Sequence, residues 1–122
     1  GAALPFIEKT TSMKDILTKM THQSVRGAAG VLDANKNLIG IITDGDIRRF
    51  LEKNQTPFSA VAENIMSVSP KTIDAGELAE KALFLMEQFQ IQMLIVLDQN
   101  SQMPKSPVGM LIYQDLLSSK VR

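Results

Sequence analysis

Cysteine and tryptophan are absent from this chain of 122 residues, and histidine occurs once, as His22. The lack of cysteine excludes disulfides and metal sites built on thiolates. One histidine is too few for a metal cluster built on histidines, and we expect no catalytic triad. No apolar run approaches the length of a membrane span, and no signal peptide is visible. We therefore expect a soluble, cytoplasmic protein.

Neither sign of charge is in excess. The chain carries 13 basic and 13 acidic residues, mixed along its length. This balance argues against nucleic-acid binding driven by the release of counterions. The composition, 44% hydrophobic and 21% charged, is that of a globular protein. The length suits one compact domain or two very small ones, and the first residues, Gly-Ala-Ala-Leu-Pro, favour a fragment of a longer protein.

The hydrophobic pattern of the first half predicts strand, helix, strand, strand and helix. These elements cover residues 5–10, 12–20, 28–32, 38–43 and 46–53. Ile7 is the main apolar anchor of the first strand. The composition of residues 33–37 is that of a turn, so the strands on either side of it are expected to be antiparallel.

The pattern then restarts after one or two helical turns. The second set of elements covers residues 69–73, 78–89, 92–97, 108–112 and 115–120. Asp33 and Asp98 correspond at an offset of 65, and Asp46 and Asp115 correspond at an offset of 69. The four extra residues fall in the second hairpin, where loops tolerate insertions. The chain therefore contains an internal repeat.

Each half is too small to bury its own sheet. We predict an α+β fold of the α/β type, in which two β-α-β-β-α repeats pack with pseudo-two-fold symmetry. The first repeat spans residues 1–54, a connection with a short helix spans 55–68, and the second repeat spans 69–122. Ligand clefts are expected between the two halves, at the junctions between strand and helix.

The stretch Gly-Ile-Ile-Thr-Asp-Gly-Asp-Ile-Arg-Arg, residues 40–49, predicts a buried strand that turns directly into an amphipathic helix. Unpaired N–H groups at a helix start favour an anion. Thr43 offers a hydroxyl there, and the Asp46 carboxylate could accept two hydroxyl protons from a sugar. The two arginines could pair with phosphate or carboxylate. The alternative is that Asp44 is the helix N-cap and the arginines form a solvated face.

A tandem repeat with this junction in each half resembles the CBS (cystathionine β-synthase) domain pair over essentially the whole chain. The family's nucleotide motif is Gly-h-x-[Ser/Thr]-x-x-Asp, where h is apolar, and residues 40–46 match it in full. The resemblance implies that Thr43 contacts phosphate and that Asp46 contacts ribose hydroxyls. The second copy keeps Asp115 but has Ile112 at the Ser/Thr position, so the second site could hold a sugar or be closed. The predicted nucleotide site comprises Thr43, Asp46, Asp44, Arg48, Ile7 and Asp115.

Residues 40–49, 93–97 and 108–117 are more closely similar to the C-terminal CBS pair of bacterial D-arabinose 5-phosphate isomerases. This resemblance implies a regulatory role in Kdo and lipopolysaccharide synthesis, beside a catalytic sugar-isomerase (SIS) domain that these residues do not supply. The expected ligand is a nucleotide or a nucleotide sugar such as CMP-Kdo, with purine nucleotides as the alternative. We expect a homo-oligomer with no cofactor, no metal, and no nucleic-acid or membrane partner.

Two other functions compete with this hypothesis. The first is a structural or oligomerisation module with both sites empty, which the loss of the hydroxyl at Ile112 favours. The second is an independent enzyme, which is disfavoured because Asp44 and Asp46 have no accompanying nucleophile or metal set. Tyr113 could line the second site or be a buried aromatic at a strand end.

Overall fold

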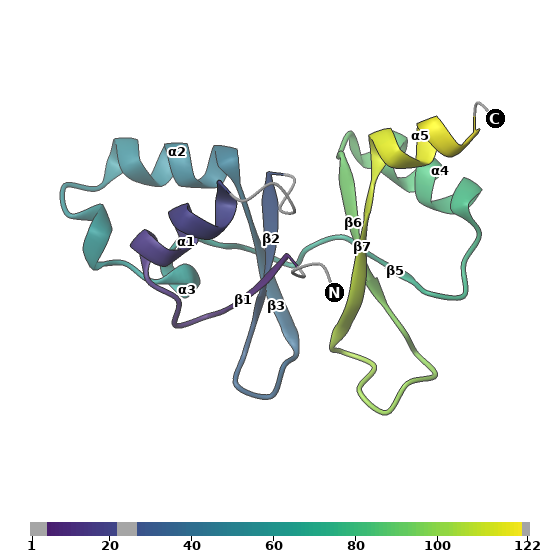
Figure 1. The fold of residues 1–122 in the computed structure, drawn as a ribbon, viewed down its shortest axis with the longest axis horizontal. Coiled ribbons are helices and arrows are strands. Elements are labelled where there is room, and N and C mark those ends of the chain that lie inside the picture. Colours follow the sequence, from purple (N-terminus) through teal and green to yellow (C-terminus); the bar gives the residue numbers. More distant parts are fainter. Residues whose placement is uncertain (1–4, 22–26, 121–122) are drawn as a thin grey trace. The chain divides into compact units, whose positions relative to one another are not determined.

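The computed structural model describes residues 5–21 and 27–120 of the chain (Figure 1). Its contacts divide the chain into a first unit, residues 1–70, and a second unit, residues 71–122. The first unit holds β1 (Phe6–Glu8), α1 (Met13–Met20), β2 (Ala28–Leu32), β3 (Leu38–Thr43), α2 (Asp44–Lys53), the 3-10 helix η1 (Pro57–Ser59), α3 (Ala62–Ile65) and β4 (Ser67–Val68). The second unit holds β5 (Thr72–Asp74), α4 (Ala79–Phe89), β6 (Met93–Leu97), β7 (Pro107–Ile112) and α5 (Tyr113–Lys120).

The first unit is a four-stranded sheet in the order β1-β2-β3-β4, with its helices on one side (Figure 1). β1 runs parallel to β2, and the other neighbouring strands are antiparallel. Apolar residues at helical spacing on α1 face the sheet, as an amphipathic helix requires. The core of this unit consists of Ile7, Met13, Ile16, Ala29, Val31, Ile42, Ile47, Ala62 and Ile65.

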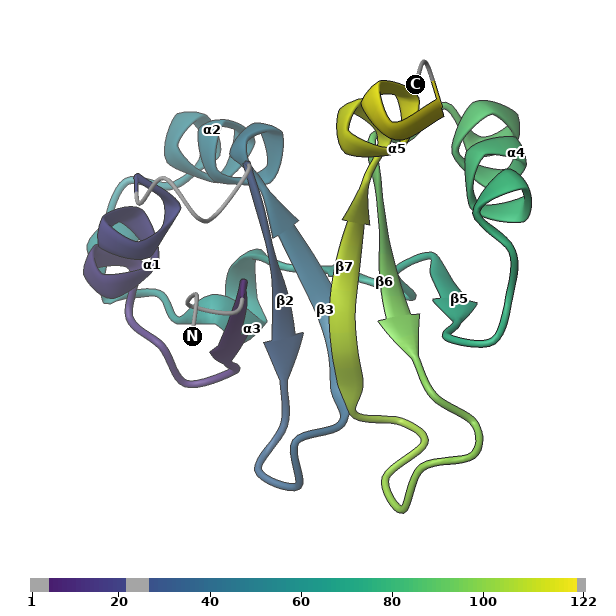
Figure 2. The ribbon, with the colours of Figure 1, turned by 45° about the vertical axis from the view of Figure 1, so that its right-hand side comes forward.

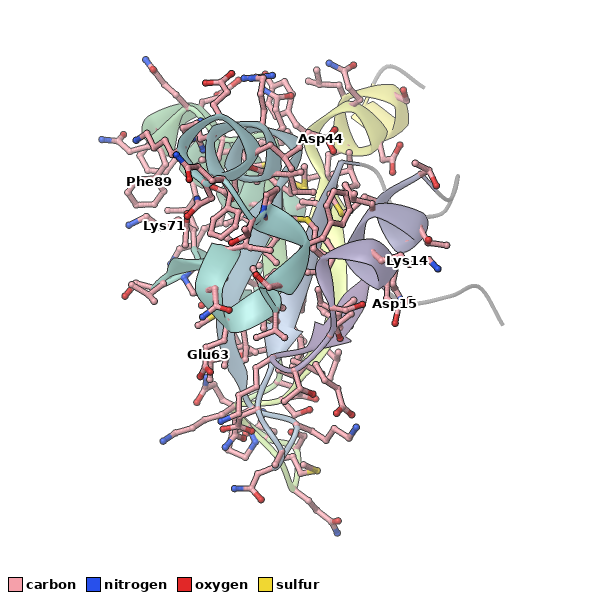
Figure 3. The ribbon with its side chains drawn as sticks, turned by 90° about the vertical axis from the view of Figure 1, so that its left-hand side faces the viewer. Lys14, Asp15, Asp44, Glu63, Lys71 and Phe89 are labelled. Atoms are coloured by element: carbon pink, nitrogen blue, oxygen red, sulfur yellow. The ribbon has the colours of Figure 1, made fainter. Side chains whose placement is uncertain are left out.

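The second unit is a three-stranded sheet in the order β5-β6-β7, covered by α4 and α5. Its core is formed by Ile73, Ala82, Met86 and Leu94, with Leu111 and Leu116 packed against it. At the start of this unit the Lys71 ammonium lies 4.5 Å from the centroid of the Phe89 ring (Figure 3). This cation–π contact links the segment before β5 to the end of α4.

The internal repeat predicted from the sequence is confirmed by the pairing register of the strands. Val31 lies opposite Gly40 in the first sheet, and Val96 lies opposite Gly109 in the second. Each hairpin has a bulge immediately after that valine. The connection between β6 and β7 is longer than that between β2 and β3, which accounts for the change of offset (Figure 2). The two units are therefore equivalent residue by residue along the paired strands of the two hairpins.

The segment 55–68, which the sequence suggested to be a connection, is built into the first unit. Ala62 and Ile65 of α3 belong to its core. β4 pairs with β3 in antiparallel fashion, so that Ser67 lies opposite Ile41. This pairing brings a residue far along the chain to the junction between β3 and α2.

Candidate functional site

The junction between β3 and α2 is closed by a reciprocal capping box. The Asp46 N–H donates to Thr43 Oγ1 over 3.2 Å, and the Thr43 N–H donates to Asp46 Oδ2 over 2.9 Å. The Thr43 hydroxyl also donates to Asp46 Oδ2, at 3.0 Å. Thr43 has an extended backbone (φ −109°, ψ 167°), so the strand continues to the cap and the helix begins at the next residue.

The other oxygen of the Asp46 carboxylate accepts two further hydrogen bonds. Arg49 Nη2 lies 2.8 Å from Asp46 Oδ1, and Ser67 Oγ lies 3.1 Å from the same atom. The Asp46 side chain is 10% exposed, whereas that of Arg49 is 57% exposed. The carboxylate is therefore a small hub that ties the first turn of α2 to its own backbone and to β4.

These hydrogen bonds outweigh the effect of burial on the acidity of Asp46. Burial by itself raises the pKa of the carboxyl, but the bonds from Thr43, Arg49 and Ser67 favour the charged form. The net effect is a pKa below the ordinary value of 3.8. The group is therefore a carboxylate, an acceptor of hydrogen bonds, at neutral pH.

The second junction has the same backbone but different side chains. The Tyr113 N–H donates to the carbonyl of Gln92 over 2.8 Å, just as the Asp44 N–H donates to the carbonyl of Gly27 over 3.2 Å. Ile112 occupies the position of Thr43 and cannot supply a hydroxyl to a cap or to a phosphate. The site in the second unit therefore lacks the hydroxyl that caps the first helix.

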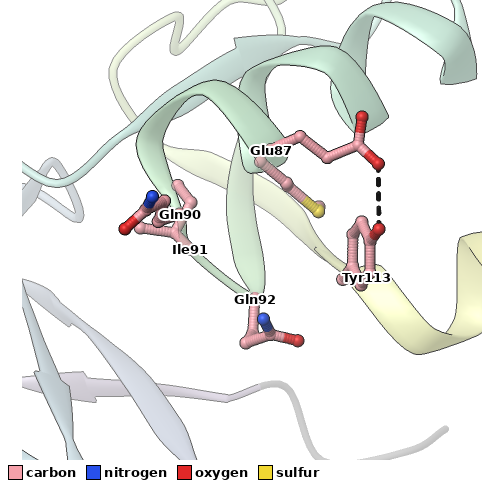
Figure 4. Close-up of a pocket in the computed structure, with 6 residues that line it drawn as sticks. Glu87, Gln90, Ile91, Gln92 and Tyr113 are labelled. Atoms are coloured by element: carbon pink, nitrogen blue, oxygen red, sulfur yellow. Dashed lines mark hydrogen bonds between the residues drawn. The ribbon is translucent and has the colours of Figure 1, made fainter.

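A pocket of about 320 Å³ lies beside this second junction (Figure 4). Tyr113 forms one side of it and donates a hydrogen bond to Glu87 Oε2 over 2.9 Å. This bond, together with burial and the negative charge of Glu87, raises the pKa of Tyr113. Gln90 and Gln92 add amide groups to the lining. The pocket thus contains an acidic side chain, which disfavours an anionic group there.

Comparison with known proteins identifies the family of these two units. A sequence model described as "CBS domain" matches residues 3–53 and again residues 61–122. The chain belongs to the CBS domain family. It is a tandem pair, with one match in each repeat, and the resemblance inferred from the sequence is confirmed.

Solved CBS structures share the fold over nearly the whole chain. CBSX2 in complex with AMP has a TM-score of 0.80 at 22% identity, covering 97% of this chain and 87% of that one. The CBS domain protein NE2398 has a TM-score of 0.82 at 23% identity, covering 100% of this chain and 91% of that one. At these identities the likeness establishes the architecture, a mixed α/β CBS pair.

Two of the sequence relatives are arabinose 5-phosphate isomerases. The arabinose 5-phosphate isomerase KdsD of Pseudomonas aeruginosa is 37% identical over 121 residues, which are 99% of this chain and 36% of the relative. The arabinose 5-phosphate isomerase KpsF of Escherichia coli is 33% identical over 93 residues, 76% of this chain and 28% of the relative. The CBS pair thus spans about a third of the length of these relatives.

The six residues of the predicted nucleotide site do not all lie together in the structure. Thr43 and Asp46 meet at the first junction, and Asp44 is exposed at the first residue of α2 (Figure 3). The alternative in which Asp44 is the N-cap is wrong, because the extended backbone of Thr43 puts its own hydroxyl in the capping position. The helix accordingly starts two residues before the predicted 46. Arg48 is exposed on α2.

The two remaining predicted residues lie away from that junction. Ile7 is 6% exposed in the core of the first unit, on a strand that does not neighbour β3, so its side chain is committed to packing. Asp115 lies in the first turn of α5 in the second unit and is exposed. His22 lies outside the described residues.

Two contributors were missed by the sequence analysis. Ser67 was assigned to the connection, and only the pairing of β4 with β3 brings its hydroxyl to Asp46. Glu87 was not singled out in the predicted helix 78–89, and only the packing of α4 near α5 brings it to the Tyr113 hydroxyl. Neither contact has a local sequence signal, because each joins residues more than twenty positions apart.

Among residues 5–21 and 27–120, no helix is long and apolar enough to cross a membrane. Within those same ranges, no group of three or more histidine or carboxylate side chains is placed to hold a metal ion.

Because of the capping box, Asp46 stabilises the fold and is also a candidate ligand contact. We expect Asp46→Ala to lower the free energy of unfolding at pH 7 by about 2 kcal/mol, because it removes a cap and charge-assisted hydrogen bonds. Urea denaturation followed by circular dichroism measures this loss. Asp44→Ala is the matched control, since it removes only a helix-terminal charge worth about 0.3–1 kcal/mol.

The difference in unfolding free energy between wild type and Asp46→Ala should also depend on pH. The pKa of Asp46 is lowered in the folded chain, so its stabilisation is complete above the unfolded pKa near 3.8 and is lost as the pH falls through the lower folded value. The difference between wild type and Asp46→Ala should therefore shrink in acid below pH 3.8. A difference that stays constant from pH 7 to pH 2.5 would mean that the carboxylate charge contributes nothing.

Proposed function

We propose that this CBS pair is a regulatory module that binds one nucleotide or nucleotide sugar at the junction of β3 and α2. The observation that carries the proposal is the combination of Thr43 and Asp46 on either side of a helix start. The helix N-terminus favours an anion, and the carboxylate favours sugar hydroxyls. The AMP complex of CBSX2 supports a nucleotide as the ligand class for this fold.

The likeness to KdsD and KpsF supports a role in an arabinose 5-phosphate isomerase. In that setting the module belongs to a longer cytoplasmic protein with a catalytic SIS domain, assembles as a homo-oligomer, and serves Kdo and lipopolysaccharide synthesis. CMP-Kdo is the proposed feedback ligand, because it combines a phosphate, a ribose and an acidic sugar. Arg48, exposed two residues after Asp46, is the proposed partner for that acid.

We expect the unmutated chain to bind one nucleotide, not two. Isothermal titration calorimetry with CMP-Kdo, CMP, AMP and ATP measures the stoichiometry. Ile112→Thr, which restores the hydroxyl in the second unit, should raise the stoichiometry toward two. Asp115→Ala should leave the first site unchanged, whereas Asp46→Asn should weaken it about tenfold or more, by loss of a charged acceptor. Two sites of equal affinity in the unmutated chain, or no heat with any of the four ligands, would contradict the proposal.

A structural or oligomerisation module without a ligand is the second candidate. One observation favours it. Thr43 and Asp46 form hydrogen bonds with each other in the capping box, so both stabilise the helix start without a ligand. This function predicts that Asp46→Asn changes stability alone, and that deleting the CBS pair from the longer protein changes its oligomeric state with no loss of a ligand response. Analytical ultracentrifugation of that protein, with and without the pair, together with nucleotide calorimetry of the pair, separates the two functions.

A further inference from the structure

The Asp46 carboxylate already has as many hydrogen bonds as it can accept. Its two oxygens offer about four lone-pair sites. Oδ2 takes the N–H and the hydroxyl of Thr43, and Oδ1 takes Arg49 and Ser67. A sugar hydroxyl therefore cannot simply be added to this carboxylate. It has to replace one of the four donors.

The four donors differ in how easily they can leave. The two from Thr43 belong to the cap, and removing them would open the first turn of α2. Arg49 and Ser67 are both exposed residues, whose donors can turn to water. Oδ1 is therefore the exchangeable oxygen of Asp46, and Oδ2 is the structural one.

The position of Arg49 over the first turn depends on a glycine. A Cβ atom on Gly45 would lie 3.1 Å from Arg49 Nη1 and 3.5 Å from Nη2. The missing side chain gives the guanidinium room to fold back along the helix and reach Asp46 Oδ1. Ser67 reaches the same atom from β4, the strand after which the chain continues into the second unit.

We propose that Arg49 and Ser67 act as a gate on the sugar position, and that a ligand with two neighbouring hydroxyls enters by replacing both on Asp46 Oδ1. The proposal rests on the proposed nucleotide site and adds two specificity-determining residues to it. A ribose diol supplies two donors for the two that leave, so the carboxylate stays satisfied. A bare anion supplies none and leaves the gate closed. Binding of the diol also cuts the side-chain link between α2 and β4.

Removing one gate donor should make nucleotide binding tighter. We expect Ser67→Ala to bind AMP about threefold to tenfold more tightly than wild type, because one net hydrogen bond no longer has to be broken. The binding of inorganic phosphate, which does not use Asp46 Oδ1, should be unchanged. Calorimetry with AMP and with phosphate measures both, after a melting curve has established that the variant is folded.

The matched control for this variant is Ser59→Ala. Its hydroxyl bonds the carbonyl of Thr56 within its own turn, 2.7 Å away, and not Asp46. Arg49→Gln tests the other half of the gate and should also tighten AMP binding. A weaker affinity for AMP in Arg49→Gln would overturn the gate role of Arg49, because it would make Arg49 a ligand contact.

The outcomes separate the gate from the nucleotide site itself. If AMP binds wild type and Ser67→Ala with equal affinity, while Asp46→Asn loses binding, the gate is overturned and the nucleotide site stands. If Ser67→Ala tightens binding of AMP and of phosphate alike, Ser67 acts on the site in general and the exchange at Oδ1 is overturned. If neither wild type nor Ser67→Ala binds AMP, ATP, CMP or CMP-Kdo, both proposals fail.

Discussion

Ile95→Asp is expected to leave the chain unfolded at neutral pH. Ile95 is 0% exposed in the middle of β6, the central strand of its sheet. Leu94, its neighbour on the opposite face of the strand, is 1% exposed, so the strand is buried on both faces. An unpaired carboxylate in this position costs on the order of 4 kcal/mol or more, a large part of the stability of a small domain. Far-UV circular dichroism and thermal melting test this result.

Val108→Asp is the control for this prediction. Val108 lies on β7 of the same sheet, at the bulge, and is 51% exposed. A carboxylate there stays in water, so the melting temperature should change little. A folded Ile95→Asp chain with the melting temperature of wild type would contradict the burial of β6.

Gly40→Ala should lower the free energy of unfolding by about 1–3 kcal/mol, the usual cost of forcing an extra group into a packed site. A Cβ atom on Gly40 would lie 2.5 Å from Met66 Sδ and 2.9 Å from the carbonyl oxygen of Ser67. The methionine side chain can move, but the carbonyl belongs to β4 and moves only with the strand. Urea denaturation of the variant measures the loss.

Gly109→Ala is a control supplied by the repeat itself. Gly109 has the same place opposite Val96 that Gly40 has opposite Val31, but a Cβ atom there would meet nothing within 4 Å. We expect its stability to stay within about 0.5 kcal/mol of wild type, because surface substitutions away from special features are usually that mild. Equal destabilisation by both substitutions would show that the glycines serve the backbone and not the approach of β4.

The two glycines illustrate what a motif can predict. Both belong to copies of the same sequence pattern, and the pattern correctly predicted the two hairpins and the offset between the repeats. It could not tell which glycine is obligatory. That difference arises because β4 pairs with β3 beside Gly40, where the sequence had suggested only a connection.

The sequence also predicted only part of the candidate site. The sequence predicted Thr43 and Asp46 at a helix start, because strand periodicity gives way to helix periodicity between them. It also predicted that Ile112 breaks the second copy, which the shared register places at the position of Thr43. Ile7 was also predicted to belong to the site, and the structure places its side chain in the core of the first unit. Hydrophobicity alone does not distinguish a core position from a pocket wall.

The sequence by itself determined the family, the order of the elements and the asymmetry between the two junctions, because each of these depends on residues close together in the chain. Only the tertiary structure decided how the Asp46 carboxylate is used. Its contact with Ser67 spans 21 positions and depends on the pairing of β4 with β3. Hydrogen bonds between distant segments depend on packing, which selects one strand register among many. Local sequence patterns do not predict which register is selected.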